Sequence, residues 1–144
     1  MAEQNYQNHR QFVPGFHYFL VPLILLTIIG AAVNLVRHIG DEHGRAQLVL
    51  ILILSFCMFV LAFFARIFAL KAQDRAVRAE ENLRHYVLTG KLLDPRLKMG
   101  QIIALRFASD AEFPALAQKA AEGGLSNDEI KKSVKNWRPD FDRA

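Results

Sequence analysis

Histidine and cysteine are the side chains in this 144-residue chain best suited to hold a metal ion or attack a substrate. Two of the five histidines, His38 and His43, flank an acidic pair, so a surface metal contact is one interpretation of that stretch. The chain has no H-E-x-x-H motif and no Cys/His spacing typical of zinc sites. A polar connecting loop is the favoured interpretation, and we expect no metal and no cofactor. The remaining histidines are scattered at His9, His17 and His85.

Nucleophilic catalysis finds no support in the sequence. Cys57 is the only cysteine and lies within an apolar run, where we expect an unreactive thiol. There is no G-x-S-x-G motif, no phosphate-binding loop and no G-x-G-x-x-G motif. Neither apolar run contains a carboxylate, so a proton or ion relay lacks its usual groups. We therefore expect a non-enzymatic protein, and no small-molecule substrate is indicated.

The strongest pattern is a pair of apolar runs, Tyr18–Val36 and Leu48–Ala65, each about as long as the roughly 20 residues that span a bilayer core. A cleaved signal peptide is the alternative for the first run, because small residues follow at Gly30, but the apolar stretch continues to Val36. The sequence predicts an all-α membrane protein with a transmembrane helical hairpin. Its segments are interfacial residues 1–16, a first span at 17–37, an outer loop at 38–46, a second span continuing as a cytoplasmic helix at 47–89, and a small helical domain at 91–144.

A small-residue seam crosses the end of the second run. Its steps alternate between three and four residues, which is the heptad pattern of a packed helix pair. Alanine is also the best helix former, so some of this pattern arises by chance in an alanine-rich helix. The seam predicts a partner helix, either within this chain or from a second copy. Its members are Ser55, Met58, Ala62, Ala65, Ala69, Ala72, Ala76, Ala79, Leu83 and Tyr86.

Two further sets of residues belong to the expected spans. Small and weakly polar residues on one face of the first span predict where it meets another helix; they are Thr27, Gly30, Ala31 and Asn34. Residues expected at the membrane interface are Arg10, Tyr18, Arg66, Lys71, Arg75 and Arg78. With Arg84, the basic residues beside the chain ends number six against two in the loop, Arg37 and Arg45, which predicts both termini in the cytoplasm.

Helix signals continue beyond the second run. Glu80 and Arg84 stand four residues apart, acid before base, which favours a helix-stabilising pair. Gly90 is a plausible stop for the long helix. Expected helix starts are Asp94-Pro95, the capping box at residues 109–112, and a cleaner capping box at residues 126–129. The last helix is expected to carry Ile130, Val134 and Trp137 on its core face, to present Lys131, Lys135 and Arg138 on another, and to end at Pro139.

Four blocks of the chain resemble one family. They are QNYQNHRQFVPGFHY at 4–18, RIFALKAQDRAVRAEENLR at 66–84, QIIALRFASDAEFPAL at 101–116 and IKKSVKNWRPDF at 130–141. The family comprises small bacterial two-span membrane proteins classed as a domain of unknown function. The resemblance covers nearly the whole chain and implies a bacterial membrane protein with a cytoplasmic helical tail. It implies no activity.

The preferred hypothesis is a scaffold or accessory subunit of the bacterial inner membrane. It would pack through the seam, either by homo-oligomerisation or within a larger membrane complex. The alternative is a membrane-tethered module that binds nucleic acid or anionic lipid through Lys131, Lys135 and Arg138. Nucleic acid is disfavoured, because Trp137 is expected in the core and acidic residues flank the basic stripe. The sequence identifies neither the partner nor the process.

Overall fold

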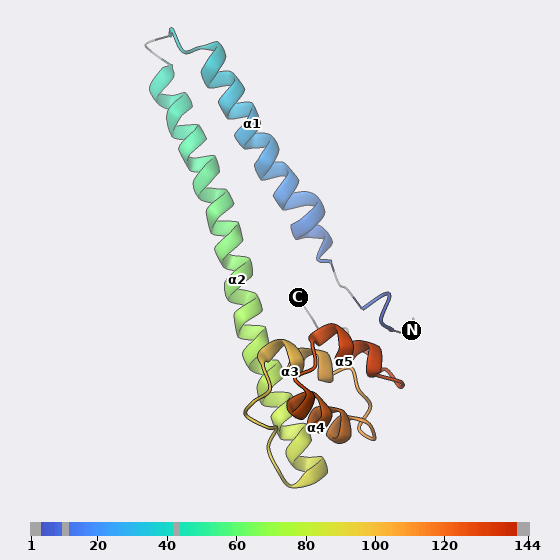
Figure 1. The fold of residues 1–144 in the computed structure, drawn as a ribbon. Helices are drawn as coiled ribbons and strands as arrows, with labels where there is room; N and C mark the ends of the chain where they lie inside the picture. Colours follow the sequence, from blue (N-terminus) through green and yellow to red (C-terminus); the bar gives the residue numbers. More distant parts are fainter. Residues whose placement is uncertain (1–3, 10–11, 42–43, 141–144) are drawn as a thin grey trace. The chain divides into compact units, whose positions relative to one another are not determined.

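The structure is a computed structural model, and it describes residues 4–9, 12–41 and 44–140. In this part the chain is all-helical, as the sequence predicts, and its strand-like pairing is a single bridge between Ala108 and Trp137. The elements are a π-helical segment η1 at Gly15–Leu20, then α1 at Val21–Arg37, α2 at Arg45–Thr89, α3 at Met99–Leu105, α4 at Phe113–Gly123 and α5 at Asn127–Ser133 (Figure 1).

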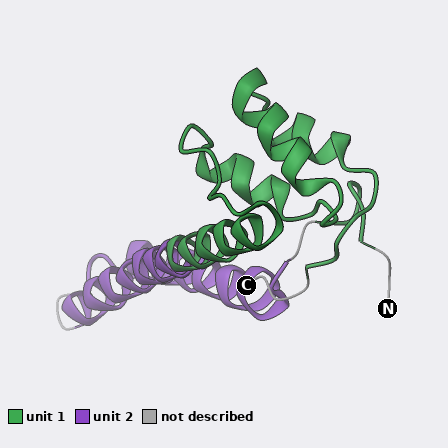
Figure 2. Cartoon of the chain, turned by 90° about the horizontal axis from the view of Figure 1, so that it is seen from below, with its two compact units in different colours: residues 1–11, 70–143 green, residues 12–69, 144 purple. Residues whose placement is uncertain are grey.

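The chain divides into two compact units (Figure 2). Unit 2, purple in Figure 2, holds Phe12–Ala69, that is, η1, α1 and the first part of α2. Unit 1, green in Figure 2, combines Leu70–Arg143 with the N-terminal residues Met1–Gln11. Unit 1 therefore holds more of the chain than the expected domain at residues 91–144, because it includes the last part of α2 and the beginning of the chain.

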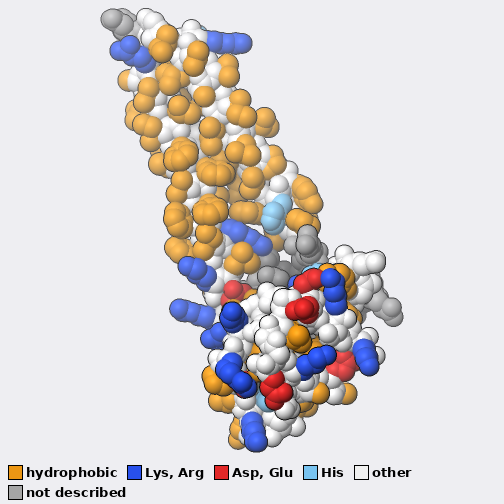
Figure 3. All heavy atoms as spheres, viewed as in Figure 1, with side chains coloured by type: hydrophobic (Ala, Val, Ile, Leu, Met, Phe, Trp, Pro, Cys, Tyr) orange, Lys and Arg blue, Asp and Glu red, His pale blue; other side chains and the backbone are white. Residues whose placement is uncertain are grey.

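Unit 2 is built from long apolar helices. The π-helical η1 and α1 form one continuous helix from Gly15 to Arg37, and Pro22, which has no N–H to donate, lies where the π-helical turns pass into the α-helix. This helix and α2 are both long and apolar enough to cross a membrane. Figure 3 shows hydrophobic side chains over α1 and the first part of α2, whereas lysine, arginine and carboxylate side chains gather over the other unit.

Helix α2 runs for 45 residues without a proline or a glycine. It ends at Thr89, and Gly90 follows in the left-handed region with φ of +73°. A residue without a β-carbon adopts that conformation at little cost. The Gly90 N–H donates to the Tyr86 carbonyl at 2.7 Å, which satisfies one of the last carbonyls of the helix. The helix thus stops where the position of Gly90 predicts.

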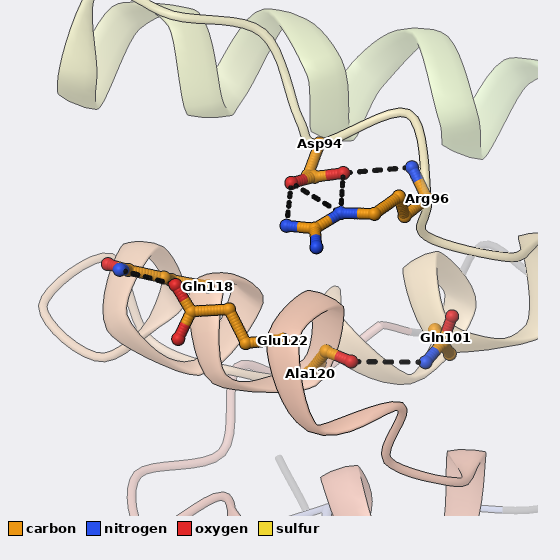
Figure 4. A network of polar contacts seen from close by, with 6 residues as sticks. All are labelled: Asp94, Arg96, Gln101, Gln118, Ala120 and Glu122. Atoms are coloured by element: carbon orange, nitrogen blue, oxygen red, sulfur yellow. Dashed lines mark hydrogen bonds and ion pairs between the residues drawn. The ribbon is translucent and has the colours of Figure 1, made fainter.

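Unit 1 has a hydrophobic core to which α3, α4 and α5 all contribute. The largest fully buried side chains are Leu105, Phe107, Phe113 and Ile130. Gln101 is buried among them, and its amide donates to the Leu125 carbonyl at 2.8 Å and to the Ala120 carbonyl at 3.4 Å (Figure 4). A buried amide of this kind is tolerated because its hydrogen bonds are satisfied.

Two predicted helix starts differ from the structure, and one is confirmed. The Ser126 hydroxyl accepts from the Glu129 N–H at 3.3 Å while the Glu129 carboxylate accepts from the Ser126 N–H, which is the predicted capping box. In contrast, α3 begins at Met99, not at Pro95. The Asp94 carboxylate instead forms a turn with Arg96, and these hydrogen bonds lower the pKa of Asp94 to about 2 (Figure 4).

The predicted capping box at residues 109–112 is replaced by a different contact. Helix α4 begins at Phe113, next to Pro114, and its N-cap residue Glu112 makes no side-chain cap. The Glu112 carboxylate accepts hydrogen bonds from the N–H groups of Lys135 and Asn136, at 3.0 and 2.9 Å. Burial raises the pKa of Glu112, but the hydrogen bonds from Lys135 and Asn136 lower it further than burial raises it, so the net effect is a lowered pKa.

The last helix is shorter than its sequence pattern predicts. Helix α5 ends at Ser133, and Val134 is already extended. Beyond it, the Ser109 N–H donates to the Asn136 carbonyl and the Arg138 N–H donates to the Phe107 carbonyl. This pairing with residues 107–109 replaces the last helical turn, because a strand-like segment at this position satisfies the same backbone groups. Trp137 still joins the core, packing on Phe107 at 4.9 Å between ring centroids.

Candidate helix-packing interface

The seam predicted from the sequence lies along α2, where a seven-residue repeat places all ten members on two adjacent positions, a and d. Position a holds Ser55, Ala62, Ala69, Ala76 and Leu83, and position d holds Met58, Ala65, Ala72, Ala79 and Tyr86. Side chains at these positions share one face of a helix. Because most of them are small, a second helix can approach this face closely.

In the unit that begins at Leu70, the seam lies on the surface. Ala72, Ala76 and Ala79 are exposed. Leu83 and Tyr86 keep 63% and 54% of their surface accessible. The structure therefore leaves this half of the seam open.

In the unit of residues 12–69, the seam residues differ in exposure. Ser55 is buried, and its hydroxyl donates to the Ile51 carbonyl at 2.8 Å, which satisfies it within the helix. Ala62 is half-buried, whereas Met58, Ala65 and Ala69 are exposed. Serine bonded back to its own helix presents mainly its carbon atoms to a neighbour, so Ser55 suits close packing.

In unit 1, the side of α2 opposite the seam is buried. Val77 and Glu81 are buried, with 8% and 5% of their surface exposed, and they lie at positions b and f of the repeat. Asn82 contributes at the next position, where its side-chain oxygen accepts from the Leu93 N–H at 3.2 Å. This unit thus covers α2 on the side opposite the seam and leaves positions a and d exposed.

Arg84 is the main polar link between α2 and the rest of its unit. Its guanidinium donates to the Asp110 carboxylate at 2.7 Å, to the Ala108 carbonyl at 2.6 Å and to the Glu81 carboxylate at 3.0 Å. It also lies over the Phe113 ring at 4.4 Å from the centroid. The predicted pair with Glu80 is replaced by a pair with Glu81, one turn away on α2, and by contacts with residues far along the chain.

Glu81 is a buried carboxylate, and burial raises its pKa above the ordinary value of 4.5. The hydrogen bond from Arg84 acts in the opposite direction, as do the nearby charges of Arg84 and Arg138. Burial dominates, so the side chain favours its neutral form more than a solvated glutamate does. Nothing in the sequence pattern singled out Glu81, because an adjacent glutamate, Glu80, occupies the better-spaced position.

The four residues predicted as the packing face of the first span lie mostly on the surface of the unit. Thr27, Gly30 and Asn34 are exposed, and Ala31 is half-buried. The Thr27 hydroxyl donates to the Leu23 carbonyl at 2.8 Å. Ile24 is the one buried residue of α1. These positions leave the predicted face as a prediction, since a partner outside this chain is compatible with their exposure.

The described residues among those predicted at the membrane interface lie in η1 and in the middle part of α2. Tyr18 is exposed in η1, and the Arg66 guanidinium lies 5.7 Å from the centroid of the Phe16 ring. Further along α2, Lys71, Arg75 and Arg78 are all exposed. Arg10 belongs to the same prediction and lies outside the described residues, as does His43 of the loop at residues 38–46.

The beginning of the chain packs onto the C-terminal helices, a contact that sequence reasoning missed. Gln4 is buried; its amide donates to the Asp140 carbonyl at 3.3 Å and accepts from the Asp140 N–H at 2.7 Å. The Tyr6 hydroxyl donates to the Asp128 carboxylate. The His9 ring lies beside those of Phe107 and Trp137, at 5.8 and 5.9 Å between centroids, with its Nε2 3.0 Å from Lys131 Nζ. No local signal in the sequence indicates this contact, because its hydrogen-bonding partners are more than 120 residues apart.

The predicted basic face at the end of the chain is divided between two kinds of structure. Lys131 lies in α5, whereas Lys135 and Arg138 lie beyond it in the extended segment. Lys131 contacts His9, and the Lys135 N–H is held by Glu112. The three cations therefore do not form a single helical stripe.

The described residues also bear on metal and small-molecule chemistry. They contain no group of three or more histidine, cysteine or acidic side chains that could hold a metal ion. The His38 ring lies 3.0 Å from the Asn34 carbonyl of its own helix. A hollow of about 440 Å³ beside α2 is lined by Glu81, Arg106 and Asp140, among others. Arg106 and Asp140 form an ion pair at 2.9 Å, so their charges serve the fold.

Comparison with known proteins gives one match. A family model described as a family of unknown function, DUF6526, matches the whole chain, residues 1–144. No curated protein and no solved structure matches the chain.

Proposed function

We propose, for a chain that belongs to the DUF6526 family of unknown function, that it is a non-enzymatic membrane protein which holds a partner helix. It acts as a scaffold or accessory subunit, by self-association or within a larger membrane complex. The observation that carries this proposal is the open seam on α2: Ala72, Ala76 and Ala79 are exposed beside exposed Leu83 and Tyr86. An apolar face of this kind in water favours burial against another surface.

Membrane insertion is the second part of the proposal. The apolar side chains of both candidate spans point outward, as Leu26, Leu54 and Leu61 do with roughly three-fifths of their surface exposed. A soluble protein buries such helices, whereas lipid is their natural surroundings. The spans form a hairpin of two helices in a bacterial inner membrane, and their flanking lysines and arginines place both termini in the cytoplasm.

The contact of Gln4 with Asp140 supports an even number of spans. These residues belong to the same unit although both apolar runs lie between them in the sequence. Both ends of the described chain therefore stand on one side of any membrane that it crosses. The contact also supports a first run that stays in the protein, because cleavage after Gly30 would remove Gln4 from the unit that buries it.

The test is a pair of leucines on the seam. We expect Ala69→Leu with Ala76→Leu to remain membrane-inserted but to lose its partner, because the added side chains keep two helix backbones apart. Insertion is measured by resistance to carbonate extraction, and assembly by the size of the complex in mild detergent. Ala111→Leu with Ala115→Leu is the matched control, since these alanines are exposed and lie outside the seam. An unchanged complex in the seam variant would show that another surface makes the assembly.

A further inference from the structure

The open face of α2 carries charges as well as apolar residues, and their positions in the repeat identify a partner. Arg75 lies at position g and Glu80 at position e, one on each side of the a and d residues. Both are exposed. Neither forms an ion pair with any residue in the part of the chain that the structure describes.

Charges at g and e are the ones that meet across a pair of packed helices. In a parallel pair, a residue at g faces the e residue that lies five positions further along the other helix. Arg75 and Glu80 have this spacing and opposite charge. An antiparallel pair would instead bring g against g and e against e, so Arg75 would not meet a glutamate.

The rest of the unit leaves room for such a pair. Arg84, at position b, bonds to Ala108 and Asp110 between α3 and α4. Val77 and Glu81 are buried at positions b and f, on the far side of the helix from the seam. The residues at a and d stay exposed in the same unit. The seam face is therefore left open by this unit, and Ala76 and Glu80 at its edge also line the hollow that Arg106 and Asp140 border.

We propose that the occupant of this face is α2 of a second copy of the chain, parallel and in register. Arg75 of each copy then pairs with Glu80 of the partner subunit, and each seam residue lies opposite its own counterpart. Two copies inserted in a membrane in the same orientation are already parallel and at equal depth, so the membrane favours this register. The inference rests on the proposed packing function of the seam and adds the identity and orientation of its partner.

Charge reversal tests the pairing in full-length protein. Two differently tagged copies are expressed together, and co-purification from mild-detergent extracts is measured. We expect Arg75→Glu or Glu80→Arg alone to lower co-purification by roughly three- to tenfold, since each places like charges at two symmetry-related sites. The double variant should recover most of the loss. Arg78→Glu is the control, because it makes the same charge change at exposed position c.

Cysteine cross-linking in membranes tests the face and register. In a Cys57→Ala background, Ala76→Cys should form a covalent dimer under a mild thiol oxidant, whereas Arg78→Cys should not, because position c points away from the partner. Efficient cross-linking of both variants, or charge reversals without rescue, would overturn the parallel α2 pair.

The outcomes also separate this inference from the proposed function. If the seam binds a different protein, the leucine variant loses its complex while differently tagged copies never co-purify, and this result refutes the second copy alone. A complex unaffected by the leucines would refute both.

Discussion

Arg84 and Glu81 show how a few side chains fix the orientation of the long helix. Arg84 bonds to Asp110 and to the Ala108 carbonyl, which decides that this edge of α2 faces the C-terminal helices. Glu81 accompanies it into the interior and accepts from Arg84 at 3.0 Å. Removing one partner of a buried charged pair leaves the other unsatisfied, so these residues are coupled.

The raised pKa of Glu81 has a consequence for stability. Its folded-state pKa lies above the ordinary value of 4.5, so the folded protein holds this proton more tightly than the unfolded chain. The contribution is complete below the ordinary value and is lost as the pH rises through the folded-state pKa. We therefore expect Glu81→Gln, which stays neutral, to gain stability relative to wild type as the pH rises above about 4.5.

Thermal unfolding of full-length protein in detergent, from about pH 4 to about pH 8, measures this difference. Glu122→Gln is the control, because Glu122 is exposed on α4, and its difference from wild type should vary little with pH. A Glu81→Gln difference that is equally flat would show that burial does not govern the protonation of Glu81.

At the scale of the elements, the sequence predicts what local signals control. The two long helices follow from apolar composition, the end of α2 follows from Gly90, and the start of α5 follows from the Ser126 capping box. The end of α5 does not follow, because backbone pairing with residues 107–109 overrides the helical pattern. Long-range contacts of that kind leave no trace in local spacing.

The N-terminal segment is the clearest element that sequence reasoning missed. Its aromatic and basic residues suggested a membrane-interface anchor, and the structure adds a buried two-bond contact between Gln4 and Asp140. We expect Gln4→Ala to destabilise the C-terminal unit by about 1–3 kcal/mol, the cost of leaving buried hydrogen-bonding groups unpaired. Gln7→Ala is the control, because Gln7 is exposed on the same segment.

Thermal unfolding and hydrogen exchange at the Asp140 amide measure the effect of Gln4→Ala. The amide should be protected in wild type and in Gln7→Ala, and should exchange faster in Gln4→Ala. Equal stability of the two variants, with a rapidly exchanging Asp140 amide in wild type, would mean that the segment lies elsewhere.

At the scale of the whole molecule, α2 belongs to both units: its first part carries exposed apolar side chains, and its last part packs within unit 1. In the first part of α2, apolar side chains such as Phe56 and Leu61 are exposed, whereas Val77 and Glu81 are buried in its last part. The candidate seam residues could be identified from the sequence, since their three-and-four spacing is local. Which of them the chain itself covers could not, because that depends on where the C-terminal helices attach.

The most direct test of the packing function is the mass and composition of the complex extracted from its own membranes in mild detergent. The account predicts a species heavier than the 16.3 kDa chain, and the α2 pairing predicts a multiple of that mass containing this chain alone. Other proteins at a fixed ratio would make it an accessory subunit. A single 16.3 kDa species, unchanged after cross-linking in the membrane before extraction, would contradict the claim that the seam holds a partner.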